Sequence, residues 1–316
     1  ILFFLLLPCV TSGLSAPVPN QYPASIRQAL IKKSQELGQS KGCYSTVGWS
    51  NRFGSVLTPA ATSVYTADRP FYWNNIDVGC RMTIIELPRK DGDSKSDLWI
   101  HSPVALDGPL QALLQDLGTV RYVVSPNYEH IKFASQWALA YPNAELWACP
   151  GLRQKVPNTG WTHEIPFGVR SLELWPGILA LHSDCEVNPF TGEPFFNEVV
   201  FYHVSSKTLL TTDLYWNYPS NDGVTNSHLR DDEISGPWEL APPVDSIPIG
   251  SKLWKLGMDQ VYRPFFQGLM VKDKDAYNEI VKIILDTWDV ETLIPAHGDI
   301  LRGKKIIQEV LGRHFK

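Results

Sequence analysis

The first half of the chain alternates short apolar segments with segments whose apolar residues recur at helical spacing. The short segments are rich in β-branched and aromatic residues, as is typical of strands, and comprise residues 81–87, 98–104, 120–124 and 144–149. Between them, residues 108–118 and 128–142 predict helices, and Asp107 and Gly118 supply an N-cap and a stop for the first. The order of strand, helix, strand, helix and strand predicts a partly parallel sheet with right-handed crossovers.

The second half predicts a further set of strands and then helices. Three successive strands are expected at residues 172–181, 197–203 and 207–213, with a hairpin between the last two. An amphipathic helix, a short strand and a closing helix follow at residues 274–288, 291–296 and 303–315. Because each half gives strands followed by helices, we expect an α/β (α+β) fold built as a four-layer αββα sandwich.

Two regions fall outside this regular pattern. Residues 53–80 contain turn residues and aromatics without a clear period, which indicates an irregular entry or an edge strand. Residues 217–250 are rich in Pro, Asn, Asp and Gly, and a loop of that length is usually functional or disordered. We interpret this loop as a candidate lid, carried by a single domain over residues 53–316.

The segment 1–52 predicts targeting rather than folded structure. It starts with the apolar run ILFFLLLPCV followed by small residues, which resembles the hydrophobic region and cleavage zone of a signal peptide. The run is too short to span a bilayer, so no integral membrane segment is expected in the mature chain. Residues 14–52 then contain five basic residues, one acid and six serines, the bias of an organelle transit segment. A signal followed by a transit segment predicts a plastid location, and plain secretion is the alternative.

Composition and charge narrow the class of partner. The chain has 316 residues, of which 44% are hydrophobic, and this is enough to bury a full core. The net charge of −5 and the lack of a basic stripe argue against nucleic acid, so a small-molecule ligand or a protein partner is favoured. The five cysteines are widely spaced without a Cys-x-x-Cys motif, so neither a zinc knuckle nor a disulfide scaffold is indicated. No Gly-x-Ser-x-Gly motif or phosphate-binding loop occurs, which leaves serine-hydrolase and nucleotide functions without local support.

The residues that could carry chemistry follow directly after predicted strands. They are His101-Ser102, Ser125 to His130, Asp213 and His297-Gly298-Asp299. Because the strand ends on one side of a sheet converge, we expect these residues to face one cleft. Taken singly, each also has an ordinary explanation: His130 as a capping or core histidine, and Asp213 and His297 as turn residues.

Three ordered motifs make the chain similar to a known family. They are PNYEHIKFASQWALAYPNAELWACPGL (126–152), NEVVFYHVSSKTLLTTDLYWN (197–217) and IPAHGD (294–299). In this order they resemble the family called domain of unknown function 4336, found in photosynthetic lineages, which in turn resembles a divergent branch of the metallo-β-lactamase fold. The resemblance covers roughly residues 64–316. It implies a metallo-β-lactamase-like four-layer αββα sandwich and a plastid association, without an established reaction.

The resemblance also implies which residues of the first motif remain as metal ligands. Metallo-β-lactamase-type hydrolases carry His-x-His-x-Asp-His after a strand. Laying His130 on the last histidine puts Ser125 and Asn127 in the positions of the first two histidines. Glu129 then takes the position of the aspartate. Serine and asparagine are poor zinc ligands, so the first metal site of these two-metal enzymes is expected to be lost.

The later ligands of the family have clearer counterparts. Asp213 matches the bridging aspartate and His297 matches the last histidine, whereas neither His182 nor His203 is in the context of the lone middle histidine. The resemblance therefore implies one surviving site, whose two imidazoles and two carboxylates suit one Zn, Fe or Mn ion. Its residues are Glu129, His130, Asp213 and His297.

A single ion leaves two functions open. It could activate water in a mononuclear metal-dependent hydrolase of a small ester, thioester or phosphoester, with Glu129 as ligand or as general base. Four protein ligands would, however, fill a tetrahedral zinc shell. Since half of the family's ligand set is missing, we favour a non-catalytic or weakly active plastid protein. It would bind a small molecule or a protein partner in the cleft that holds the metal ions in the two-metal enzymes. The walls of this cleft are expected at Trp99, Trp137, Tyr215 and Trp216.

Overall fold

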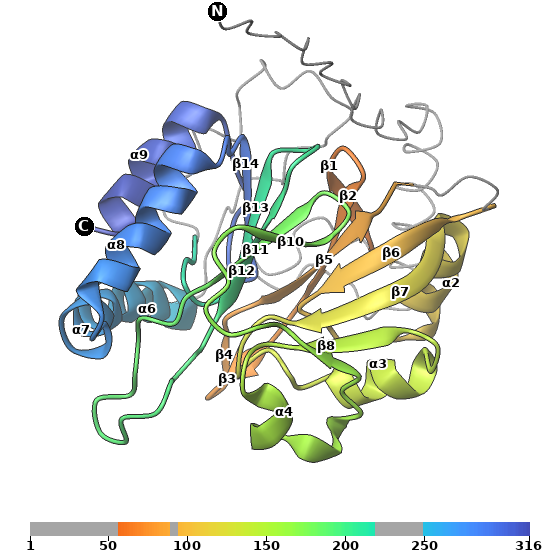
Figure 1. The fold of residues 1–316 in the computed structure, drawn as a ribbon, viewed down its shortest axis with the longest axis horizontal. Coiled ribbons are helices and arrows are strands. Elements are labelled where there is room, and N and C mark those ends of the chain that lie inside the picture. Colours follow the sequence, from red (N-terminus) through yellow and green to blue (C-terminus); the bar gives the residue numbers. More distant parts are fainter. Residues whose placement is uncertain (1–55, 89–93, 219–248) are drawn as a thin grey trace, which may run out of the picture.

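The computed structural model describes residues 56–88, 94–218 and 249–316 (Figure 1). The predicted targeting segment 1–52 lies outside the described residues, as does the predicted loop 217–250 except at its ends. The described residues form two main sheets with helices on their outer sides.

The first sheet has seven strands in the order β1-β2-β5-β6-β7-β8-β9. They are β1 (Thr58–Ala61), β2 (Val64–Arg69), β5 (Cys80–Glu86), β6 (Ser96–His101), β7 (Gly118–Ser125), β8 (Glu145–Ala148) and β9 (His163–Glu164). The pairs from β1 to β6 are antiparallel and those from β6 to β9 are parallel, so the predicted partly parallel sheet is confirmed. Residues 53–80 were expected to form an irregular entry or an edge strand; β1 is the edge strand of this sheet, and β2 is an inner strand that the sequence did not predict. Every residue of β2 is buried, and a strand buried on both faces shows no alternation in its sequence.

The second sheet has six strands in the order β10 to β15. They are β10 (Leu172–Trp175), β11 (Ile178–His182), β12 (Val199–His203), β13 (Thr208–Thr211), β14 (Thr292–Pro295) and β15 (Leu301–Arg302). Only β13 and β14 pair in parallel within this sheet. The segment 172–181, expected as one strand, forms the hairpin β10–β11, because Pro176 and Gly177 turn the chain and Gly177 adopts a φ of +73°.

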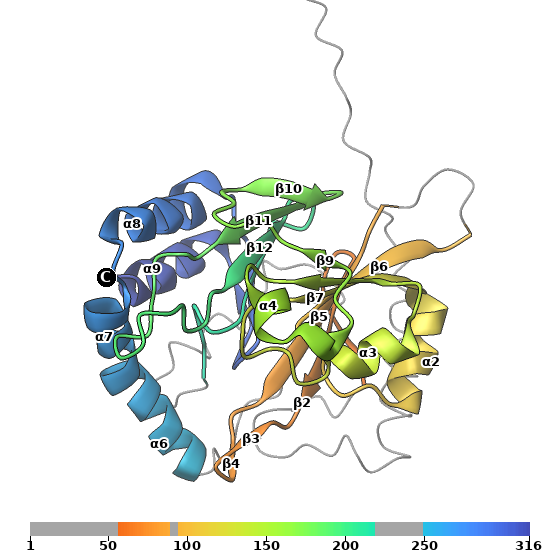
Figure 2. The same ribbon diagram turned by 60° about the horizontal axis from the view of Figure 1, so that its bottom comes forward.

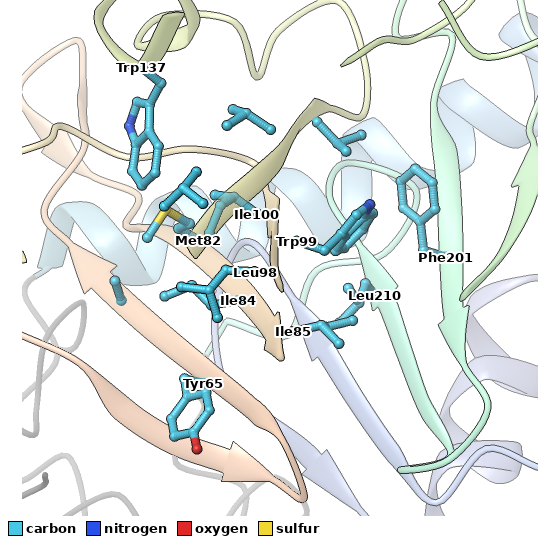
Figure 3. Packing of buried hydrophobic residues seen from close by; sticks show 14 of the residues in the cluster. Tyr65, Met82, Ile84, Ile85, Leu98, Trp99, Ile100, Trp137, Phe201 and Leu210 are labelled. Carbon is cyan, nitrogen blue, oxygen red and sulfur yellow. The ribbon is translucent and has the colours of Figure 1, made fainter. Parts of the chain in front are cut away.

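The main core lies between the two sheets and continues to the helices that cover the first sheet. Trp99 of β6 lies with its ring centroid 5.1 Å from that of Phe201 of β12, and both side chains are fully buried (Figure 3). A second apolar cluster joins the outer face of the second sheet to α8 (Lys274–Lys282) and α9 (Lys304–His314). On the other side, α2 (Gly108–Leu117), α3 (Ala134–Ala140) and the short α4 (Leu152–Lys155) lie along the first sheet (Figure 1). The layers thus follow the order helix, sheet, sheet, helix, which confirms the αββα sandwich.

The helix expected at residues 128–142 is much shorter than predicted. Asp107 caps α2 as expected, since its side chain accepts a hydrogen bond from Leu110 N. In contrast, α3 begins only at Ala134, and the residues before it form turns. The Asn127 carboxamide oxygen accepts hydrogen bonds from two backbone N–H groups there, and such local bonds compete with a helix.

A helical run that the sequence did not predict follows the loop. It comprises α6 (Ile249–Gly257), the π-helical turn η3 (Met258–Tyr262), α7 (Arg263–Phe265) and the π-helical turn η4 (Phe266–Met270). Its start, α6, contacts the small hairpin formed by β3 (Tyr72–Trp73) and β4 (Ile76–Asp77) (Figure 2). The remaining short elements are η1 (Pro157–Thr159) and η5 (Ile283–Thr287), which continues α8. None of the helices in the described ranges has the length and apolar character needed to cross a bilayer.

Candidate metal centre

Three of the predicted site residues lie together at the ends of three strands. His130 follows β7, Asp213 follows β13 and His297 follows β14. One ligand atom from each lies within 4.8 Å of the others. The carboxylate is central: its Oδ2 is 3.3 Å from His130 Nε2 and its Oδ1 is 3.6 Å from His297 Nε2. The convergence of strand ends expected from the sequence thus brings two imidazoles and one carboxylate to one point.

Hydrogen bonds at the far side of each imidazole orient its Nε2 atom. His297 Nδ1 is 2.8 Å from the carbonyl oxygen of Gly79, and a carbonyl only accepts, so Nδ1 carries the proton and Nε2 presents a lone pair. His130 Nδ1 is 2.6 Å from Ser102 Oγ, which can accept from it in the same way. This arrangement is the one by which proteins fix the tautomer of metal-binding histidines.

Asn127 ties the His130 turn to the Asp213 loop. Its side chain is fully buried and makes four hydrogen bonds. The amide nitrogen donates to Asp213 Oδ2 at 2.6 Å and to Thr212 Oγ1 at 3.0 Å. The amide oxygen accepts from the backbone N–H groups of Glu129 and His130 at 3.0 and 2.8 Å. The residue in the position of a family histidine therefore acts here as a structural bridge between two candidate ligands.

Glu198 fixes the backbone of the Asp213 loop, a role that the sequence analysis missed. Its carboxylate accepts hydrogen bonds of 2.6 to 2.7 Å from the N–H groups of Thr212, Asp213 and Leu214. Burial and the charge of Asp213 raise the pKa of Glu198 to about 7. A single acid at the start of the apolar segment 197–203 was the available signal, since such an acid is buried only with partners.

Arg81 of the first sheet holds the His297 loop of the second sheet. Its Nη1 donates to the carbonyl oxygens of Pro295 and Gly298 at 2.8 and 2.7 Å, on either side of His297. Its Nη2 forms a 2.7 Å ion pair with Asp68, and both side chains are largely buried. The guanidinium thus bridges the two sheets next to the candidate centre.

Gly298 is required by a close backbone approach. It adopts a φ of +94°, and a Cβ placed there would collide with the backbone oxygen of Asn217. Asn217 and Gly298 form an isolated parallel bridge, with Asn217 N donating to His297 O at 3.0 Å. Only a residue without a Cβ at position 298 therefore allows the backbone after His297 to approach that of Asn217 this closely.

Burial and mutual charge shift the pKa values of the three candidate ligands. Burial alone raises the pKa of the Asp213 carboxyl, but His130, His297 and Asn127 outweigh this effect and lower it. Burial lowers the pKa of His130, whereas the charge and hydrogen bond of Asp213 act in the opposite direction and leave it raised. For His297, burial prevails and its pKa is lowered. The group therefore keeps an ionised carboxylate and at least one neutral imidazole near neutral pH.

The remaining residues matched to the family ligands lie apart from this group. The Glu129 side chain is exposed; it lines the adjoining pocket, but its carboxylate is not among the atoms within 4.8 Å. Ser125 is fully buried, and its Oγ has no hydrogen-bond partner among the described residues. Neither candidate for the middle histidine joins the group. The His182 ring accepts a hydrogen bond from Gly168 N and is hydrogen-bonded to the Asn197 side chain. The His203 ring is hydrogen-bonded to two serine side chains.

A pocket of about 470 Å³ opens onto the three residues. Its other walls are mostly aromatic and come from Phe71, Trp73, Phe133, Phe195, Phe196, Tyr218, Trp254 and Tyr262. Two of these positions, Trp254 and Tyr262, lie with Met258 at a spacing of four residues on the unpredicted helical run. That spacing was the signal for a helix with one apolar face.

The four aromatic residues expected to wall the cleft do not line this pocket. Trp99 and Trp137 are fully buried in the core between and beside the strands. Tyr215 and Trp216 are also buried, with their ring centroids 4.9 and 5.0 Å from that of His314. The prediction of these walls is wrong, because Trp99 and Trp137 face the core, and Tyr215 and Trp216 pack against His314 of α9.

The donor atoms fit a divalent transition-metal ion. Two imidazole nitrogens and a carboxylate are ligands that zinc, iron and manganese all accept. Three protein ligands, rather than the four expected from the sequence, are the number found at catalytic zinc sites, where a further position binds water or substrate. The described residues therefore form a three-residue group that could hold a metal ion beside a ligand-sized pocket.

Comparison with known proteins agrees with this fold. The chain is similar to a fragment (1–254) of a protein described as diflavin flavoprotein A 5 from Nostoc sp. PCC 7120, at 15% identity, covering 82% of this chain and 95% of that chain with a TM-score of 0.50. It is also similar to a metallo-β-lactamase from Hirschia baltica, at 11% identity, 82% and 96% coverage and a TM-score of 0.48. A third similar structure is the metallo-β-lactamase FIM-1 from Pseudomonas aeruginosa in its mono-zinc form, at 13% identity, 82% and 95% coverage and a TM-score of 0.46. No curated protein matches the chain.

At these identities the structural likeness concerns the fold alone. The family comparison is more specific, because a family model described as "Domain of unknown function (DUF4336)" matches residues 61–168. That range includes β2 to β9 and the motif with Glu129 and His130, so it covers the first of the three motifs recognised in the sequence. Over residues 61–168 the chain is therefore similar to the DUF4336 family, and its αββα fold is metallo-β-lactamase-like.

Proposed function

We propose that this protein binds one divalent metal ion through His130, Asp213 and His297 and acts as a mononuclear metal-dependent hydrolase. The proposed substrates are small esters, thioesters or phosphoesters. The observation that supports the proposal is the convergence of three ligand atoms within 4.8 Å on the wall of a pocket. A three-ligand group removes the objection that four protein ligands would fill a zinc shell.

The residues around the group have distinct roles in this proposal. When bound, the ion acts as a Lewis acid toward water and toward a carbonyl or phosphoryl oxygen. Gly79 and Ser102 keep the two Nε2 atoms turned toward Asp213. Glu129, exposed at the same pocket, is the proposed general base that takes a proton from the attacking water. In the hydrolysis, the water oxygen bonds to the acyl or phosphoryl group and the leaving alcohol or thiol receives the proton.

A second candidate function is the binding of a ligand without catalysis. One observation favours it: Asn127 already donates a 2.6 Å hydrogen bond to Asp213 Oδ2. With His130 Nε2 at 3.3 Å from the same oxygen, the carboxylate has partners from the protein alone. In that case the chain would keep the old cleft as a binding pocket for a small molecule or a protein partner.

Metal-dependent turnover distinguishes the two functions. The full chain is stripped with a chelator, reloaded with zinc, manganese or ferrous ion, and assayed on p-nitrophenyl acetate, a phenyl thioacetate and bis-p-nitrophenyl phosphate. The hydrolase proposal expects a rate on at least one of them that rises up to one equivalent of metal and falls about 100-fold or more in Asp213→Asn. Asp286→Asn, which alters an exposed acid on η5, is the control that keeps its rate. No turnover by any loaded form would leave only the binding function, whereas turnover that needs no metal would contradict both functions.

We also propose a plastid location, with secretion as the alternative, on the composition of residues 1–52 alone. A fluorescent protein fused behind residue 52 and imaged in an algal cell with a complex plastid tests it. Fluorescence in the medium or the secretory pathway would support secretion instead.

A further inference from the structure

We infer that the pocket beside His130, Asp213 and His297 selects amphiphilic ligands. Such a ligand has an apolar body, aromatic or long-chain, and one polar head group with electron-donating oxygen atoms. The inference rests on the proposed function for the role of the head group, which would meet the three-residue group. It deepens that function because it names the kind of small ester or carboxylate that the site prefers.

The walls that carry the inference come from three segments distant in sequence. Trp73 belongs to the β3–β4 hairpin, Phe196 to the segment before β12, and Trp254 and Tyr262 to the helical run after the loop. Ring contacts join them: the centroids of Trp73 and Trp254 are 5.1 Å apart, and those of Phe196 and Tyr262 are 6.2 Å apart. Aromatic side chains from both halves of the sandwich therefore enclose one apolar space.

The segment that carries Phe195 and Phe196 is held in place before any ligand binds. Its anchor is Glu186, a buried acid whose carboxylate accepts hydrogen bonds from the N–H groups of Phe195, Phe196 and Asn197 at 3.3, 2.9 and 2.7 Å. A preformed wall of this kind lowers the ordering cost of binding a rigid apolar ligand. This wall is therefore already formed in the ligand-free chain, unlike side chains that become ordered only around one substrate.

Charged groups are confined to a few positions of the pocket lining. Besides the three candidate ligands, the charged residues among the described lining are Glu129 and Lys132. The Lys132 ammonium lies 4.9 Å from the centroid of the Phe71 ring and makes a cation–π contact with it. From this position the ammonium can also reach the anionic head group of a ligand. A ligand without an apolar body would leave the aromatic walls in contact with water, which is unfavourable.

Trp73 stands at the mouth of the pocket. It lines the pocket, yet 52% of its surface remains exposed. Its neighbour Tyr72 is similarly exposed, at 56%, but does not line the pocket. The two adjacent residues therefore provide a variant and a matched control on the same small hairpin, and truncating either exposed ring costs the fold little.

The test compares the binding of 2-naphthoate and acetate to the metal-loaded full chain by calorimetry. Both probes carry a carboxylate head, and only one has an aromatic body. Burying about 150 Å² of apolar surface at about 25 cal/mol per Å² would favour 2-naphthoate by ~100-fold or more, after some loss to ordering. We expect at least that ratio, a decrease of tenfold or more in naphthoate affinity in Trp73→Ala, and no change in Tyr72→Ala.

Two results would overturn the inference: equal affinities for the two probes, or a naphthoate affinity that Trp73→Ala leaves unchanged. The same titration of metal-free protein separates this outcome from failure of the proposed function. Naphthoate selectivity that depends on Trp73 in a chain that binds no metal would overturn the metal proposal and support the apolar pocket. Stoichiometric metal binding with equal probe affinities would do the reverse.

Discussion

Replacing Asn127 with alanine should weaken both the fold and the candidate metal centre. The substitution removes four hydrogen bonds of a fully buried side chain. Three of them join neutral groups, at about 1 kcal/mol each, and the bond to the Asp213 carboxylate adds about 2 kcal/mol. Water entering the space left behind would restore part of this sum. We therefore expect the free energy of unfolding to fall by about 3–5 kcal/mol, a large part of the stability of an ordinary domain.

The same change should lower the affinity for metal. Without the amide, Asp213 loses a partner that orients its carboxylate, and the turn that presents His130 loses its acceptor for two N–H groups. Loss of a residue that orients metal ligands costs about tenfold or more in affinity. A competition titration with a chromophoric chelator measures this, and urea unfolding of the metal-free chain measures stability separately.

Asn158→Ala is the control for Asn127→Ala, because Asn158 is an exposed asparagine on η1. It should change neither quantity by more than the error of measurement. A loss of less than 1 kcal/mol in Asn127→Ala, together with unchanged metal affinity, would refute the role of Asn127 as the bridge between the two candidate ligands.

Three further predictions follow from the neighbouring contacts. Arg81→Met removes both hydrogen bonds that hold the loop around His297, so metal affinity measured by chelator competition should fall about tenfold. An unchanged affinity would show that the loop keeps its conformation without Arg81. Gly298→Ala should lower the melting temperature by several degrees in a thermal scan, because the new Cβ meets backbone at a positive φ; a melting temperature equal to that of the original chain would contradict the close approach. Burial lowers the folded-state pKa of His203 and His314 from 6.5 to about 4, so unfolding takes up protons below pH 6.5. The stability that these neutral histidines contribute should be full above pH 6.5 and lost toward pH 4, at about 2 kcal/mol per histidine by pH 5. Because Glu198 and His130 shift in the opposite direction, the test compares urea unfolding at pH 7 and pH 5 with that of His203→Gln; a pH difference that this variant leaves unchanged would contradict the prediction.

Local sequence signals predicted the elements whose causes are local. The caps of α2 and the alternation of strands and helices in the first half depend on residues close in sequence, and both were confirmed. The meeting of His130, Asp213 and His297 was also expected, because each follows a strand and strand ends converge. Their role as metal ligands stays a prediction.

Long-range contacts decided what the sequence did not reveal. The turn at residues 127–133 replaces the start of a helix because Asn127 reaches both its own turn and the Asp213 loop, which is 86 residues away. The pocket walls join β3 to α6, separated by most of the chain, so no local pattern indicated them. Similarly, nothing local indicated that Trp99 would fill the core while Trp73 would stand at the pocket. Glu129 has the position of a family ligand, but its exposed side chain lies outside the converging group.

The metal content of the purified full chain tests the central claim most directly. After incubation with one metal at a time and removal of the excess, plasma mass spectrometry should find about one zinc, iron or manganese ion per chain. His297→Ala should lower this to near zero, whereas His163→Ala, at an exposed histidine on β9, should not. A chain that retains no stoichiometric metal, or one whose metal content is the same in His297→Ala and His163→Ala, would contradict the account.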